Sequence, residues 1–145
     1  MITTQVWTDG AYSGAIGGWA CLVEGELDSG VYGKTVNEAE LYAILRAVEL
    51  SPSGLGVHIH TDSKLAIGLL TNWHTDKPRL LDLVEAIEAV VYSKKQTLTL
   101  SHTKAHRADD ANLKVDRAAR YEARAARLST HCTSPSSPSG VHTFQ

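Results

Sequence analysis

Hydrophobic and polar residues follow two different periods along this chain. Five short segments are rich in β-branched, aromatic and other apolar residues, a composition that predicts β-strands. These segments span residues 2–8, 19–23, 31–35, 56–61 and 97–101. Four longer segments repeat apolar residues three and four positions apart, which predicts amphipathic helices. The helical segments span residues 37–50, 62–70, 78–92 and 111–128.

The order of these segments predicts the fold class. Three leading strands with short connections fit an antiparallel meander, because adjacent antiparallel strands need only a tight turn. The two later strands alternate with helices and fit parallel crossovers in the same sheet. We therefore expect an α/β fold with a mixed five-stranded sheet flanked by helices. It would form one domain over residues 1–128, followed over residues 129–145 by a disordered tail rich in Ser and Pro.

Charge is unevenly distributed, although the net charge is only −2. Residues 1–63 hold eight acids and two bases, whereas residues 93–145 hold four acids and nine bases. This is either an ordinary mixed surface or an acidic metal site beside a basic, phosphate-binding surface. Cys21 and Cys132 predict neither a disulfide framework nor a zinc site, and no secretory or long apolar segment is evident. We expect a soluble, cytoplasmic monomer.

Four carboxylates occupy positions from which they could converge. Asp9 and Asp62 follow predicted strands, and sites in open α/β sheets form at strand ends. Glu40 lies on the helix face that should pack on the sheet, where an unpaired charge is costly. Asp116 lies four residues after Asn112, so both extend from the same side of the last helix. Oxygen ligands alone suit Mg²⁺ or Mn²⁺, so the set could hold such ions.

Each carboxylate also has an ordinary structural explanation. Asp62 can cap the helix that follows it, and Glu40 can complete a capping box in which Asn37 is the N-cap. Asp116 can form a surface ion pair with Arg120, one helical turn further on. Taken singly, these residues do not decide between the two kinds of explanation.

Four motifs in this order resemble those of the type 1 ribonuclease H family. They are Thr8-Asp9-Gly10 with Gly17-Gly18-Trp19-Ala20, Asn37-Glu38-Ala39-Glu40-Leu41, Thr61-Asp62-Ser63, and Lys104-Ala105-His106 with Asn112 and Asp116. The resemblance covers about residues 2–128. It implies a ribonuclease H-like fold and an endoribonuclease that hydrolyses the RNA strand of RNA·DNA hybrids. The implied products carry 5′-phosphate and 3′-hydroxyl ends.

The resemblance also implies roles for particular residues. The implied ligands of two Mg²⁺ ions, which Mn²⁺ could replace, are Asp9, Glu40, Asp62 and Asp116. His106, on a loop, would help proton movement or product release. The implied contacts to the hybrid are Gly10, Ala11, Asn37 and Asn112. Because family members recognise 2′-hydroxyl groups in the minor groove, sequence preference should be weak.

One departure from the family concerns substrate affinity. Many members grip the DNA strand with a basic, Trp-rich protrusion, but residues 72–79 hold only Lys77 and Arg79 as bases. Affinity would then be modest, come from a partner, or rest on the arginines of the last helix. Those arginines are equally consistent with a solvated helix face.

Two other classes of protein remain alternatives at this point. One is another nuclease of the same broad fold, such as a junction resolvase or an integrase-like enzyme, although the Lys104-Ala105-His106 loop favours ribonuclease H. The other is a non-catalytic nucleic-acid-binding module. Such a module would have no reason to keep all four carboxylates.

Overall fold

The computed structural model describes residues 2–103 and 110–131, except for the side chains of Thr130 and His131. The described part of the chain contains five strands and four helices. The strands are β1 (Thr3–Ser13), β2 (Ile16–Val23), β3 (Glu26–Val31), β4 (Gly56–Thr61) and β5 (Thr97–His102). The helices are α1 (Val36–Leu50), α2 (Lys64–Asn72), α3 (Pro78–Ser93) and α4 (Asp110–His131). None of these helices is both long enough and apolar enough to cross a membrane.

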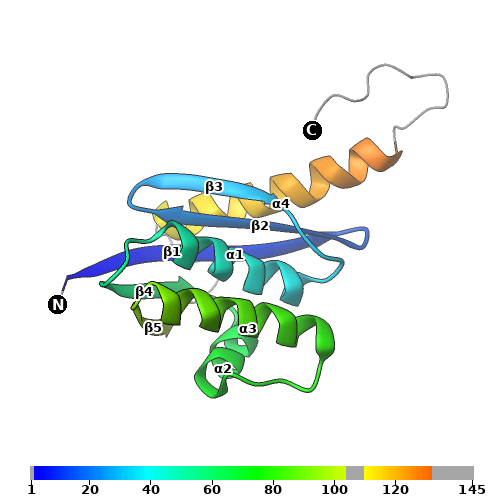
Figure 1. Cartoon of the computed structure of the whole chain (residues 1–145). Coiled ribbons are helices and arrows are strands. Elements are labelled where there is room, and N and C mark those ends of the chain that lie inside the picture. Colours follow the sequence, from blue (N-terminus) through cyan, green and yellow to red (C-terminus); the bar gives the residue numbers. More distant parts are fainter. Residues whose placement is uncertain (1, 104–109, 132–145) are drawn as a thin grey trace.

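The strands form one mixed sheet in the order β3-β2-β1-β4-β5 (Figure 1). β1, β2 and β3 pair antiparallel, whereas β4 runs parallel to both β1 and β5. The predicted α/β fold, with a leading meander followed by parallel strands, is confirmed. Because β1 and β4 are parallel, their carboxyl ends lie at the same end of the sheet.

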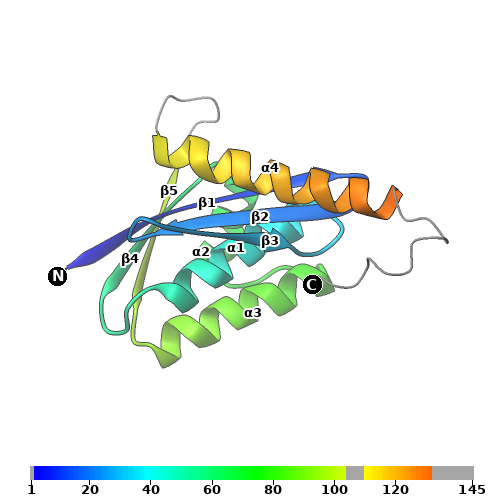
Figure 2. The same ribbon diagram turned by 90° about the horizontal axis from the view of Figure 1, so that it is seen from above.

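Helices cover both faces of the sheet. Figure 2 shows α4 on one face and the other three helices on the opposite face. Val6 belongs to the larger core beneath α1 and α3, whereas Trp7 packs in the smaller core beneath α4. Successive strand residues face opposite sides, so Asp9, two positions after Trp7, lies on the α4 face.

The first hairpin is longer than the sequence predicted. The prediction ended the first strand before Asp9 and treated residues 13–18 as a Gly-rich connection. Instead, β1 continues to Ser13, and Ser13 pairs with Ile16 across a two-residue turn. Gly14 and Ala15 both adopt positive φ, of 56° and 64°, as tight hairpin turns require. Asp9 therefore lies within a paired strand, opposite Ala20.

The third strand also differs from the prediction. It was expected over residues 31–35, after a turn over residues 25–30, but it spans Glu26–Val31. The turn is only Glu24-Gly25, and both residues have positive φ. Val23 therefore pairs directly with Glu26, which moves the strand toward the amino terminus.

The helix caps differ from those predicted, which bears on the candidate ligands. Thr35, rather than Asn37, is the N-cap of α1, and its capping box is completed by Glu38 instead of Glu40. Asp62 does not cap α2, because the Ser63 hydroxyl accepts the Ala66 N–H at 3.0 Å. The capping explanations for Glu40 and Asp62 were therefore wrong.

The last helix extends beyond its expected end at residue 128. α4 continues to His131, and residues 132–145 lie outside the described residues. The domain boundary at residue 128 and the disordered tail stay predictions.

Candidate metal centre

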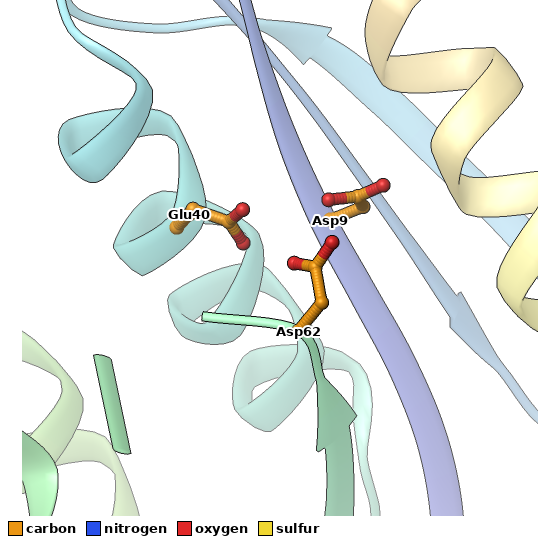
Figure 3. A group of neighbouring side chains, drawn as sticks. All are labelled: Asp9, Glu40 and Asp62. Carbon is orange, nitrogen blue, oxygen red and sulfur yellow. The ribbon is translucent and has the colours of Figure 1, made fainter. Parts of the chain in front are cut away.

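Three of the four predicted metal ligands converge in space. One carboxylate oxygen from each of Asp9, Glu40 and Asp62 lies within 4.8 Å of the others. Figure 3 shows the three side chains pointing toward one another from β1, α1 and the end of β4. Asp9 and Glu40 are nearly inaccessible, with 4% and 6% of their surfaces exposed.

The parallel pairing of β1 and β4 sets the positions of the two aspartates. The last paired residues are Trp7 and His60, and each aspartate lies two residues beyond its member of that pair. β4 ends at Thr61, whereas β1 continues. Beyond Trp7, β1 therefore has no paired strand on its β4 side. The Asp62 side chain can turn toward Asp9 at that place.

Glu40 reaches the aspartates from the opposite face of the sheet, and Gly10 makes this possible. A Cβ atom at Gly10 would lie 2.7 Å from the Glu40 backbone nitrogen and 3.1 Å from the Ala39 carbonyl carbon. No side chain fits there, so the first turns of α1 lie directly on β1. This close approach brings the Glu40 side chain to the carboxyl end of β4.

The fourth predicted ligand, Asp116, lines the same hollow from α4. This carboxylate hollow has a volume of about 420 Å³. Its lining residues are Asp9, Gly10, Ala11, Tyr12, Ser13, Val36, Glu40, Asp62, Asp116, Arg120 and Arg124. Asp116 Oδ1 also accepts a hydrogen bond from Arg120 Nε at 3.1 Å. The ion pair considered from sequence is present, and its carboxylate is part of the hollow.

The electrostatics of the hollow favour occupation by a cation. Burial, followed by the nearby Asp62 and Asp116 carboxyls, raises the pKa of Asp9 to about 8, although the Gly10 N–H donates to it at 2.8 Å. Burial and the charges of Asp9 and Asp62 raise the pKa of Glu40 well above its usual value. Glu40 Oε1 is buried and has no hydrogen-bond partner among the described residues. All-oxygen donors with an unpartnered buried oxygen fit a divalent cation such as Mg²⁺.

These pKa shifts predict that the metal-free protein loses stability as the pH rises. In the unfolded chain Asp9 and Glu40 ionise near pH 4, whereas folded Asp9 keeps its proton up to about pH 8. Between these values folded Asp9 binds more protons than unfolded Asp9, so its contribution makes the free energy of unfolding fall by about 1.4 kcal/mol per pH unit. The raised pKa of Glu40 acts in the same direction. The Asp9 contribution levels off above about pH 8.

Urea unfolding with a chelator at pH 5, 7 and 9 measures this dependence. The Asp9→Asn variant isolates the contribution of Asp9 and should show a smaller fall. Equal slopes for the wild-type and variant proteins between pH 5 and pH 7 would contradict the raised pKa.

Of the other predicted site residues, some lie at the carboxylate hollow and others lie away from it. Gly10 and Ala11 line the carboxylate hollow, and Asn112 is buried on α4, one turn before Asp116. Asn37 instead lines a separate hollow of about 450 Å³ beside Lys77 and Arg79. His106 lies outside the described residues.

Sequence reasoning did not place five further residues at the carboxylate hollow, namely Tyr12, Ser13, Val36, Arg120 and Arg124. Tyr12 and Ser13 were missed because β1 was expected to end before them. Arg120 had been considered as an ion-pair partner of Asp116, and Arg124 only as part of a basic helix. Their spacing of four and eight residues from Asp116 was the available signal, since such positions share one helix face.

Solved structures establish the class to which this fold belongs. The N-terminal RNase H domain of a Mycobacterium tuberculosis protein, solved as a fusion with maltose-binding protein, matches with a TM-score of 0.75 and 19% sequence identity. The match covers 90% of this chain and 99% of that one. RNase H1 from Halobacterium salinarum matches with a TM-score of 0.67 and 19% identity over 86% of this chain and 99% of that one. The chain has a ribonuclease H fold.

Sequence comparison then identifies the family. The RNase H family profile matches residues 2–124. Ribonuclease HI of Xylella fastidiosa strain 9a5c is 30% identical over 146 aligned residues, covering 88% of this chain and 96% of the relative. Ribonuclease H of Parvibaculum lavamentivorans is 38% identical over 76 residues, which span 48% of this chain and about half (51%) of that relative. The chain belongs to the ribonuclease H family and is a hydrolytic enzyme of that family.

Proposed function

We propose that this enzyme cuts the RNA strand of RNA·DNA hybrids with two metal ions and leaves 5′-phosphate and 3′-hydroxyl ends. The observation that carries the proposal is the convergence of the buried Asp9 and Glu40 with the half-buried Asp62, in which Glu40 Oε1 lacks a hydrogen-bond partner among the described residues. The names of the relatives, ribonuclease H and ribonuclease HI, support the same activity.

The proposed metal ligands are the four acids of the carboxylate hollow, Asp9, Glu40, Asp62 and Asp116. Two Mg²⁺ ions held there, or Mn²⁺ in their place, would activate the attacking water and stabilise the leaving 3′-oxygen. Asp9 and Glu40 must lose their protons to act as ligands, so metal affinity should rise with pH. Arg120 orients Asp116 through the hydrogen bond to Oδ1.

The remaining predicted residues would contact the substrate or move protons. Gly10 and Ala11 line the hollow, where the cut strand would pass. Asn112 and Asn37 would contact the hybrid on either side of it. His106 would accept or deliver a proton near the leaving group. The monomeric state and cytoplasmic location expected from the sequence stay predictions.

Cleavage of a hybrid with a 5′-labelled RNA strand tests the proposed chemistry. We expect cutting in Mg²⁺ or Mn²⁺ and none with excess chelator. The 3′ ends should accept addition by a polymerase without prior phosphatase treatment, and the 5′ ends should be ligatable. Glu40→Gln, which removes one charge without changing the shape of the side chain, should be inactive.

Different product ends would contradict the proposal. A 2′,3′-cyclic phosphate, or cutting that persists in chelator, would indicate attack by the RNA's own 2′-hydroxyl. The carboxylates would then have no role as metal ligands.

A further inference from the structure

A row of arginines leads away from the metal centre along α4. Arg120 and Arg124 follow Asp116 at intervals of four residues, and both line the carboxylate hollow. Arg127 follows on the same side, seven residues after Arg120. Its side chain lies against the β1–β2 turn, since a Cβ atom at Gly14 would collide with Arg127 Cδ. The helix rises 1.5 Å per residue, so Arg124 lies about 12 Å along the axis from Asp116.

Three other residues that line the hollow have neutral side chains. They are Tyr12 and Ser13 of β1 and Val36 of α1. The hollow is thus acidic at the carboxylates and basic toward the β1–β2 turn. A phosphodiester strand whose reacting phosphate lies at the carboxylates would bring an adjacent phosphate to the basic end.

The two arginines of the hollow differ in their availability to a substrate. Arg120 donates to Asp116, so its guanidinium is already engaged in orienting a carboxylate. Arg124 is exposed, and within residues 2–103 and 110–131 the structure records no ion pair for it. Guanidinium groups bind phosphate through paired N–H donors, and such charge-assisted hydrogen bonds are the strong ones.

We propose that Arg124 binds a phosphate of the cut strand next to the scissile phosphate, and so supplies affinity that a basic protrusion supplies in other family members. This inference rests on the proposed function, because it takes the RNA·DNA hybrid as the occupant of the hollow. Arg124 is a binding residue in this account, and the chemical step does not depend on it.

Steady-state kinetics of hybrid cleavage test the proposal with three variants. Arg124→Ala should raise KM about tenfold, the value of one charge-assisted hydrogen bond, and leave kcat unchanged. Arg124→Lys, which keeps the charge, should recover part of that loss. The control is Lys95→Asn, which removes one positive charge at the α3–β5 turn, at the opposite end of β5 from the hollow. Asparagine tolerates the positive φ of 53° at that position.

The salt dependence and a modified substrate locate the contact. The slope of log KM against log salt concentration should fall by about 0.9 for Arg124→Ala, as expected for one lost phosphate contact. Hybrids with a single uncharged methylphosphonate, placed one or two positions to either side of the cut, remove one phosphate charge at a time. One of these positions should weaken binding to the wild-type enzyme but not to Arg124→Ala.

The outcomes separate this inference from the proposed function. If the wild-type enzyme cuts hybrids and Arg124→Ala has the KM and salt slope of Lys95→Asn, the phosphate contact is overturned and the activity stands. If every methylphosphonate position affects the wild type and Arg124→Ala equally, the contact is also overturned. If the wild-type enzyme does not cut hybrids at all, the proposed function fails first.

Discussion

Asp9→Asn is expected to abolish hybrid cleavage and to make the metal-free protein more stable. Asparagine keeps the shape of the side chain but removes a charge that is buried beside Asp62 and Asp116. At pH 8 we expect the free energy of unfolding to rise by at least about 1 kcal/mol, because asparagine removes the cost of burying an ionised carboxylate and, with it, the repulsion from Asp62 and Asp116. For a protein of this size that corresponds to about 3–5 °C in Tm.

Activity, melting temperature and metal response should be measured together for this variant. Mg²⁺ should raise the Tm of the wild-type protein, because it binds the folded state, and should raise that of Asp9→Asn much less. Asp82→Asn is the matched control, since it makes the same substitution on the exposed surface of α3. Near-wild-type cleavage by a normally folded Asp9→Asn protein would remove Asp9 from the metal centre.

Gly18→Ala is expected to cause the largest loss of stability. A Cβ atom at Gly18 would collide with the Ala119 carbonyl oxygen and lie 2.6 Å from the Ala123 backbone nitrogen. Backbone atoms of a helix cannot rotate away, so α4 must move off β2. We expect a loss of about 2–4 kcal/mol, at or above the usual range for overpacking. Cleavage should also fall, because Asp116 moves with α4.

Thermal or urea unfolding tests this prediction, and the control is a substitution at a glycine where an added Cβ atom meets no other atom. Gly68, in α2, has nothing within 4 Å of an added Cβ atom. Gly68→Ala should therefore leave stability unchanged or raise it by up to about 1 kcal/mol, since alanine favours helix. Equal unfolding midpoints for Gly18→Ala and Gly68→Ala would show that α4 does not depend on close contact with β2.

The sequence predicted the order and type of all nine elements in the described residues, because their apolar periods are regular. It failed at the β1–β2 hairpin, where Gly10, Gly17 and Gly18 have low strand propensity. Two of these glycines serve helices distant in sequence: Gly10 admits α1 and Gly18 admits α4. A local pattern cannot reveal a requirement that arises only when the helices pack.

The helix caps show a second limit of local patterns. Thr35 and Asn37 are both favourable N-cap types, and each has a glutamate three residues later. Only the backbone conformation selects Thr35, with φ −133° and ψ 160°. That choice matters for the site, because it leaves Glu40 free of a capping role.

Part of the candidate site was accessible from the sequence. Asp9 and Asp62 stood out as acids beside strand ends, and Glu40 as an acid on a packing face. Asp116 was noted on the same helix side as Asn112, and the resemblance to ribonuclease H gave it the role of a metal ligand. The place of Arg124 in the hollow was missed. Its spacing of eight residues from Asp116 indicates a shared helix face, but whether that face borders the hollow depends on how α4 crosses β1 and β2 and on the length of the hairpin beneath it.

Cleavage across a panel of nucleic acids tests the central claim most directly. Wild-type protein and Asp62→Asn should each be given an RNA·DNA hybrid, single-stranded RNA, duplex RNA, duplex DNA and a four-way junction, in Mg²⁺ and then in Mn²⁺. We predict that the wild-type protein cuts only the hybrid and that Asp62→Asn cuts nothing. Folded wild-type protein that leaves the hybrid intact in both metals would contradict the account. Cutting of the junction would then indicate a resolvase, and no cutting at all would indicate a binding module.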